Sequence, residues 1–171
     1  MKLSKNFSLD EVVRSATATK LGIDNTPEQE HLDNLQVVVD EIAQPLRDHF
    51  GKPVRINSGY RSPALNEAIG GSTKSQHSKG EALDLEIDGV SNLEVADWIT
   101  DNCDYDQVIL EFYNPTDGPN SGWVHASCKA ILSENRERKL IALKDGKKTV
   151  YTLSLIHISE PTRRYAISYA V

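Results

Sequence analysis

The sequence predicts a single domain of the α+β class, and three observations support this. The length of 171 residues suits one compact domain with a real hydrophobic core. In the first third of the chain, apolar residues recur at three- and four-residue spacing, which is typical of amphipathic helices. Beyond that, segments of alternating apolar and polar residues are interleaved with shorter helical patterns. Helices followed by strands that alternate with helices indicate α+β rather than a purely helical or purely β fold.

Two helices are expected before the first strand. Ser8 is a typical N-cap, and Glu11 completes a capping box for a short helix. A longer helix is expected from residue 28 to residue 50, because its apolar residues fall on one face. Thr26 is the expected cap of that helix. Pro45 should kink or break it, because proline lacks the N–H donor that a helix interior requires.

Four strands and two further helices are expected in the middle of the chain. The strand patterns are VRINSG, EALDLEI, DQVILEFY and WVHAS, and the helical ones are SPALNEAIGG and SNLEVADWITDN. In three of the strands one polar residue lies opposite apolar neighbours, namely Asp84, Glu111 and His125. Any one of these alone is more often a surface residue than part of a site. The charged run ENRERK, residues 134–139, is typical of a solvated helix surface.

Composition excludes several classes of protein. The net charge of −6 leaves no basic footprint for nucleic acid. Cys103 and Cys128 do not make a disulfide framework and are expected to be reduced thiols. The opening MKLSKNFSLDEVVRS lacks the apolar run of a secretory signal, and no stretch approaches membrane-spanning length. We therefore expect synthesis in a cytoplasm, with another factor delivering the protein to any substrate outside.

The C-terminal segment has an unusual character. LSLIHISEPTR, residues 153–163, resembles the translated read-through of a transposon-type sequencing adapter. Periodicity alone would assign a last strand to this region. We expect instead that residues 1–152 form the natural domain and that residues 153–171 are a non-native tail.

Several residues together could form a hydrolytic metal site. His77, Asp84 and His125 would supply two neutral imidazoles and one carboxylate, and a catalytic zinc typically has three protein ligands and one open position. The same ligand set also fits non-haem iron. Hydrolysis needs a further carboxylate to move protons, for which Glu111 is the candidate. Arg61 could stabilise the developing oxyanion.

These segments resemble a known family. SGYRS, SQHSKGEALDLE, ILEFY and GWVHAS are similar to the zinc D-alanyl-D-alanine peptidases of peptidase family M15, in the branch common in phages and prophages. The family pattern is matched at Ser75, His77, Gly80, Ala82, Asp84, Glu111, Trp123 and His125. The resemblance implies a small hedgehog-like zinc peptidase fold, with an antiparallel sheet and flanking helices. It also implies one Zn²⁺ per chain held by His77, Asp84 and His125, with Glu111 as base and acid and Arg61 as oxyanion stabiliser.

The resemblance leaves the substrate contacts less defined. Ser75 could hydrogen-bond a metal ligand or cap its loop, and Tyr60 and Trp123 could line the cleft or simply pack beside it. Glu111 is separated from His125 by the loop NPTDGPNSG, so strand pairing must position it. Glu86 and Asp88 are its competitors for the role of base.

The family resemblance implies a peptidase that acts on peptidoglycan stem peptides. It would be a D-Ala-D-Ala carboxypeptidase or an L-Ala-D-Glu-type endopeptidase of phage or prophage origin, acting on the cell wall after release or as part of a virion. Its expected partners are peptidoglycan peptides, with virion components as a further class, and a monomer is the expected state. One alternative is a non-catalytic zinc domain that binds cell wall or has a structural role in a virion. A weaker alternative is an iron oxygenase, although no jelly-roll pattern supports it.

Overall fold

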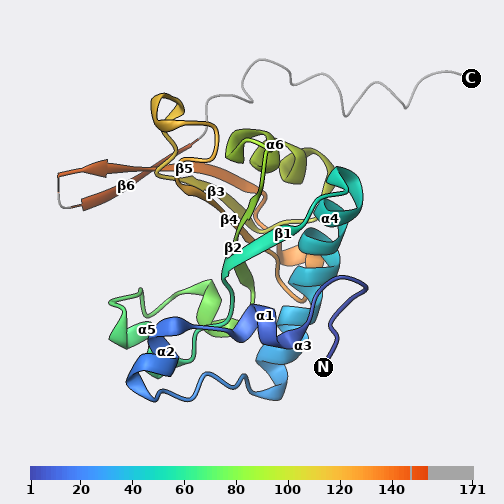
Figure 1. Ribbon diagram of the computed structural model, residues 1–171, viewed down its shortest axis with the longest axis vertical. Helices are drawn as coiled ribbons and strands as arrows, with labels where there is room; N and C mark the ends of the chain where they lie inside the picture. The colour runs from blue at the N-terminus through green and yellow to red at the C-terminus, as the bar shows by residue number, and fades with distance from the viewer. Residues whose placement is uncertain (147, 154–171) are drawn as a thin grey trace, which may run out of the picture.

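The computed structural model describes residues 1–146 and 148–153 (Figure 1). Its helices are α1 (Leu9–Val13), α2 (Ala16–Leu21), α3 (Gln29–Val38), α4 (Gln44–Phe50), α5 (Pro63–Ala68) and α6 (Asn92–Asn102). Its strands are β1 (Val54–Ser58), β2 (Ala82–Ile87), β3 (Gln107–Glu111), β4 (Trp123–Ser127), β5 (Arg138–Asp145) and β6 (Lys148–Leu153). The predicted α+β class is confirmed. The expected non-native tail lies outside the described residues, apart from Leu153 at the end of β6.

The sheet has the strand order β1-β2-β4-β3-β5-β6. Four of its five pairings are antiparallel, as expected, but β3 and β5 run parallel. The end of β4 explains this difference, because Ser127 pairs with Gln107 at the start of β3. A short connection from that point brings Arg138 beside Gln107 on the other side of β3, and the chain then continues in the same direction as β3.

One face of the sheet is covered by helices. Apolar residues of β2, β3 and β4 form a single core with residues of α3, α4 and α6, including Leu35, Leu46, Leu83, Leu85, Ile99, Val108, Leu110 and Val124. The alternation within the strands places the polar residues on the opposite face. Beyond this core, β5 and β6 project as an arm (Figure 1).

The long helix predicted for residues 28–50 differs from an ideal helix in two ways. It begins at Gln29, with Glu28 at the cap position, so the expectation for Thr26 was wrong; the Thr26 N–H instead bonds the Asp24 side chain at 2.9 Å. Its middle, Val39–Ala43, is a π-helical turn directly before Pro45. Pro45 cannot donate a backbone hydrogen bond, and widening the preceding turn accommodates its ring.

The structure confirms one further local prediction and contradicts another. The capping box of Ser8 and Glu11 is present at α1, as predicted. The run ENRERK is not a helix surface, because it leads out of a single 3₁₀ turn, Leu132–Glu134, into β5. No helix in the described part of the chain is long and apolar enough to cross a membrane.

Candidate metal centre

Three predicted ligands meet on the open face of the sheet. His77 Nε2 lies 3.2 Å from His125 Nδ1 and 3.2 Å from Asp84 Oδ1. His125 Nδ1 lies 3.0 Å from the same carboxylate oxygen. All three side chains are buried. Within the described residues, they form the group whose ligand atoms converge as a metal ion would require.

Strand register explains how two of these ligands come together. Asp84 on β2 is paired directly with His125 on the antiparallel strand β4, so their side chains lie side by side on the same face. His77 comes from a 3₁₀ turn, Gln76–Lys79, immediately before β2. Gly80 ends this turn with φ +73°, and a Cβ at that position would lie 2.2 Å from the backbone oxygen of His31. Glycine is therefore required where the turn crosses α3.

A backbone carbonyl on the side away from the other ligands fixes the orientation of the His77 ring. Its Nδ1 lies 2.8 Å from the backbone oxygen of Gly59, which can only accept a hydrogen bond. Nδ1 therefore carries a proton, and Nε2 is the ring nitrogen that faces Asp84 and His125. This carbonyl-bonded arrangement is typical of histidines that bind metals.

The charges of the ligands also suit a metal. Burial lowers the pKa of His77, which favours the neutral ring that coordinates metals. Burial alone would raise the pKa of Asp84. The influence of His77 and the hydrogen bonds with both histidines outweigh burial, however, and hold the pKa of Asp84 well below its usual range. Asp84 is therefore a carboxylate at neutral pH.

The residues present fit a tetrahedral cation. Zinc with bonds of about 2.0–2.2 Å holds its ligand atoms about 3.3 Å apart. The three separations of 3.0–3.2 Å between the side-chain atoms are close to that value. Two neutral imidazoles and one carboxylate match the donors found in catalytic zinc sites, and the cleft above them leaves room for a further ligand.

Arg61 contacts the group from its side. Its Nη2 donates to Asp84 Oδ2 at 2.8 Å, and its Nε donates to the hydroxyl of Ser58 at 2.9 Å. Sequence reasoning placed Arg61 at an oxyanion, whereas the structure places it on a ligand carboxylate. The guanidinium has further N–H donors for a substrate, so the two roles are compatible.

Glu111 is brought to the same cleft by the pairing of β3 with β4. It lies opposite Trp123, two residues along each strand from the pair Ile109 and His125. Partial burial raises the pKa of Glu111, and Asp84 adds to this effect, while His125 and Arg61 oppose it. A raised pKa suits a group that must both accept and return a proton near neutral pH.

The backbone around Glu111 is tightly constrained. Phe112, the next residue, has the left-handed φ of +53°, and its N–H bonds Ala142 of β5 at 2.9 Å. Gly122, immediately before β4, also has a positive φ of +68°. A Cβ on Gly122 would lie 1.9 Å from the backbone oxygen of Glu111. The backbone of Gly122 therefore packs directly against that of Glu111 and closes the loop between Glu111 and Trp123. This contact, together with the strand pairing, fixes the position of Glu111.

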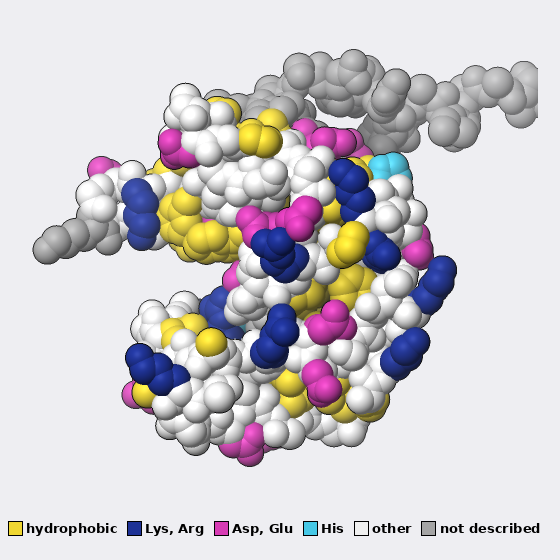
Figure 2. All heavy atoms as spheres, in the orientation of Figure 1, with side chains coloured by type: hydrophobic (Ala, Val, Ile, Leu, Met, Phe, Trp, Pro, Cys, Tyr) yellow, Lys and Arg dark blue, Asp and Glu magenta, His cyan; other side chains and the backbone are white. Residues whose placement is uncertain are grey.

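The metal-ligand group lies at the base of a cleft of about 550 Å³. Figure 2 shows the molecule hollowed between the β5–β6 arm and the lobe that carries α2 and α5. The cleft is lined by Arg61, Ser72, Lys74, Ser75, Gln76, His77, Asp84, Gln107, Ile109, Glu111, Trp123, His125, Leu140 and Tyr151. Tyr151 belongs to β6, so the arm supplies one wall.

The structure separates the tentative substrate residues. Ser75 and Trp123 line the cleft, and Ser75 makes no capping hydrogen bond with its side chain. Tyr60 is buried, and its hydroxyl lies 3.1 Å from His31 Nδ1, so the structure does not bring it to this cleft. Cys128 is buried in the hydrophobic core and does not line this cleft.

The competitors of Glu111 lie elsewhere. Glu86 accepts a hydrogen bond from the Asn57 side chain at 2.8 Å. Asp88 forms an exposed ion pair with Arg55 at 2.7 Å. Neither carboxylate is among the residues that line the cleft. Of the three candidates, Glu111 is the one whose position allows proton transfer there.

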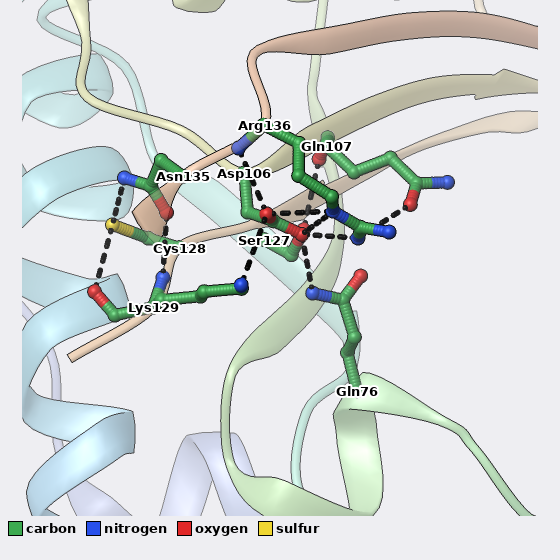
Figure 3. Close-up of polar contacts among 8 residues, drawn as sticks. All are labelled: Gln76, Asp106, Gln107, Ser127, Cys128, Lys129, Asn135 and Arg136. Carbon is green, nitrogen blue, oxygen red and sulfur yellow. Dashed lines mark hydrogen bonds and ion pairs between the residues drawn. The ribbon is translucent and has the colours of Figure 1, made fainter. Parts of the chain in front are cut away.

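Sequence reasoning missed a polar network that supports His77 (Figure 3). Gln76, its neighbour, donates to Asp106 Oδ2 at 2.9 Å. The fully buried Asp106 also receives hydrogen bonds from the Arg136 backbone and guanidinium, and Lys129 lies 4.0 Å away. The network connects the turn that carries His77 with the start of β3. In the sequence, this network is marked only by an aspartate directly before a strand. Its partners Gln76 and Arg136 are each 30 residues away, so the neighbouring residues do not identify them.

Comparison with known proteins gave one family match. A family model described as Peptidase M15 matches residues 5–116. The matched segment includes His77, Asp84 and Glu111 and ends before β4, which carries His125. No curated protein matches the chain.

Proposed function

The chain belongs to the peptidase M15 family, and from that premise we propose that it is a zinc-dependent metallopeptidase that hydrolyses peptidoglycan stem peptides. Peptidases of this family are generally zinc-dependent. The observation that carries the proposal is the buried convergence of His77, Asp84 and His125 beside Glu111 in one cleft. Zinc held by these three side chains would acidify a water molecule and polarise the scissile carbonyl.

The remaining residues of the cleft supply proton transfer and positioning. Glu111 would take the proton from the attacking water and return it to the leaving amine, for which its raised pKa is suited. Arg61 would hold Asp84 with one edge of its guanidinium and stabilise the developing oxyanion with free donors. Trp123 and Tyr151 both line the cleft and would offer aromatic surfaces to a bound peptide.

The substrate class follows from the resemblance to phage-type D-alanyl-D-alanine peptidases. Two kinds of bond are in question, the terminal D-Ala-D-Ala bond and the L-Ala-D-Glu bond. This chemistry is compatible with an enzyme that lyses the host cell wall and also with one that acts as part of a virion. We favour a peptidase over a non-catalytic binding domain, because Glu111 in the cleft serves hydrolysis and is not needed for binding alone.

Mass spectrometry of defined muropeptides tests the proposal. The zinc-loaded chain should cleave them, and an EDTA-treated sample should not until zinc is returned. Product masses distinguish the loss of one D-alanine from an internal cut. If zinc is bound, the fold is intact and no muropeptide is cleaved, the peptidase proposal fails in favour of a zinc domain that binds cell wall or a virion partner.

A further inference from the structure

A second cavity adjoins the metal-centre cleft. Its volume is about 810 Å³, which exceeds that of the cleft. It lies between α2, β1 and α5 and is lined by Arg14, Ser15, Ala16, Thr17, Thr19, Lys20, Ile56, Asn57, Ser58, Tyr60, Arg61, Leu65 and Ile69. Arg61 lines both cavities, so the two lie on either side of this side chain. We call it the cationic cavity.

The charge of this cavity is opposite to that of the chain. Three of its lining residues, Arg14, Lys20 and Arg61, are cations, and none is an aspartate or glutamate. The chain as a whole has a net charge of −6. Among the described residues, Arg14 and Lys20 take part in no ion pair of 4.0 Å or less. A concave surface with one sign of charge attracts ligands of the other sign.

The other lining residues indicate a peptide rather than a small inorganic anion. Ile56, Leu65 and Ile69 give the cavity an apolar wall, and Ile69 is 44% exposed. Serine, threonine and asparagine side chains supply hydrogen-bonding groups along the rest. A cavity of this size, with mixed apolar and polar walls, suits several connected groups of a peptide.

We propose that the cationic cavity binds an acidic segment of the peptide substrate, at a distance from the bond that is cut. This inference rests on the proposed function, because it extends the substrate from the metal-centre cleft past Arg61. Arg14 and Lys20 then recognise a free carboxylate of the peptide. Binding energy from this remote contact orients the scissile bond over the metal centre. The enzyme accordingly discriminates between peptides by their charge, not only by the residues at the cut.

Calorimetry with a matched pair of peptides tests this without requiring turnover. The probes are the stem pentapeptide L-Ala-γ-D-Glu-L-Lys-D-Ala-D-Ala and the same peptide with the α-carboxyl of its glutamate amidated. Glu111→Gln is introduced into every chain so that neither peptide is consumed. The chain with Arg14 and Lys20 intact should bind the acidic peptide at least about tenfold more tightly, which is the effect of one good charged contact.

The variant Arg14→Ala/Lys20→Ala should lose this preference and bind both peptides with similar affinity. Lys52→Ala/Arg55→Ala removes two exposed cations that do not line the cavity, and it should retain the preference. Equal binding of the two peptides by the parent chain, or a preference that survives in the cavity variant, would overturn the inference. Because binding is measured directly, failure of the cavity is distinguishable from failure of the proposed hydrolysis.

Discussion

Arg61 and Asp84 form an ion pair in which each oxygen of the carboxylate has a separate function. Oδ2 accepts the hydrogen bond from the guanidinium at 2.8 Å, while Oδ1 lies within 3.2 Å of both histidines. The Arg61 side chain is only 19% exposed and is also held by Ser58. This arrangement leaves a single oxygen of Asp84 directed at the metal position and prevents rotation of the carboxylate.

Replacing Arg61 should therefore weaken metal binding as well as catalysis. We expect Arg61→Ala to lower zinc affinity by about 10–100-fold, as is usual when a partner of a metal ligand is removed. Arg61→Lys should restore part of this loss, because it keeps the charge without the planar fork. Competition with a chromogenic chelator measures the affinity. Unchanged zinc affinity in Arg61→Ala would show that Arg61 acts on the substrate alone.

The roles of His77 and Glu111 should separate in two variants. His77→Ala removes a ligand and should lose both zinc and activity. Glu111→Gln keeps the shape of the side chain but not its basicity, so zinc content should stay at one per chain while kcat falls by about 100-fold or more. Metal analysis and peptide hydrolysis on the same samples measure both effects. Glu86→Gln is the matched control outside the cleft, and full activity in Glu111→Gln would remove Glu111 as the base.

Gly59 should be intolerant of even one added carbon. A Cβ there would lie 2.2 Å from the backbone oxygen of Val12. The carbonyl of Gly59 itself accepts the hydrogen bond from His77 Nδ1. We expect Gly59→Ala to cost about 2 kcal/mol, or about 5 °C in Tm, and to weaken zinc binding. Gly22→Ala adds a carbon that meets nothing within 4 Å. It should lower Tm through its positive φ alone and leave zinc affinity unchanged, whereas equal zinc affinity in both variants would argue against a role of the Gly59 carbonyl.

Asp106 should make stability depend on acid pH. Burial tends to raise the pKa of Asp106, but its hydrogen bonds with Arg136 prevail, so its pKa lies below the unfolded value. Its contribution is therefore present above about pH 4, the unfolded pKa, and is lost as the pH falls through the lower folded pKa.

Asp106→Asn should cost about 2–3 kcal/mol at neutral pH, because it leaves Arg136 without its charged partner. The difference from the parent chain should shrink progressively below pH 4. Urea unfolding of the zinc-free proteins at several pH values checks this. If the difference in the free energy of unfolding between the two proteins stays constant down to pH 2, the charge of Asp106 is not what stabilises the fold.

The parts of the site that sequence predicted are those with a local signature. Alternation of apolar and polar residues places Asp84, Glu111 and His125 on the open faces of strands, and the strands are where they were expected. The glycine after His77 marks the turn that precedes β2. These features depend on neighbours within a few residues, so they are visible without knowledge of the fold.

The remaining features depend on partners that are distant in sequence. Alternation gives the face of a strand but not its register, so the position of Glu111 beside the metal centre could not be derived. The pairings of Arg61 with Asp84 and of Gln76 with Asp106 arise only when the sheet forms. Strand β5 begins within the charged run ENRERK, whose composition concealed it. Tyr60, beside Arg61 in sequence, does not line this cleft but lines the cationic cavity next to it.

The left-handed backbone of Phe112 has a consequence for how this chain would change under selection. That conformation costs a non-glycine residue about 1–2 kcal/mol. Phe112 also packs edge-on against Trp123, a contact worth about 0.5–1.5 kcal/mol. Asparagine, which tolerates this backbone, would lose the ring contact and relieve the strain, so the two effects nearly cancel. Selection for folding alone would therefore favour neither residue strongly, and retention of the phenylalanine would reflect the ring that it places against Trp123, a residue that lines the cleft.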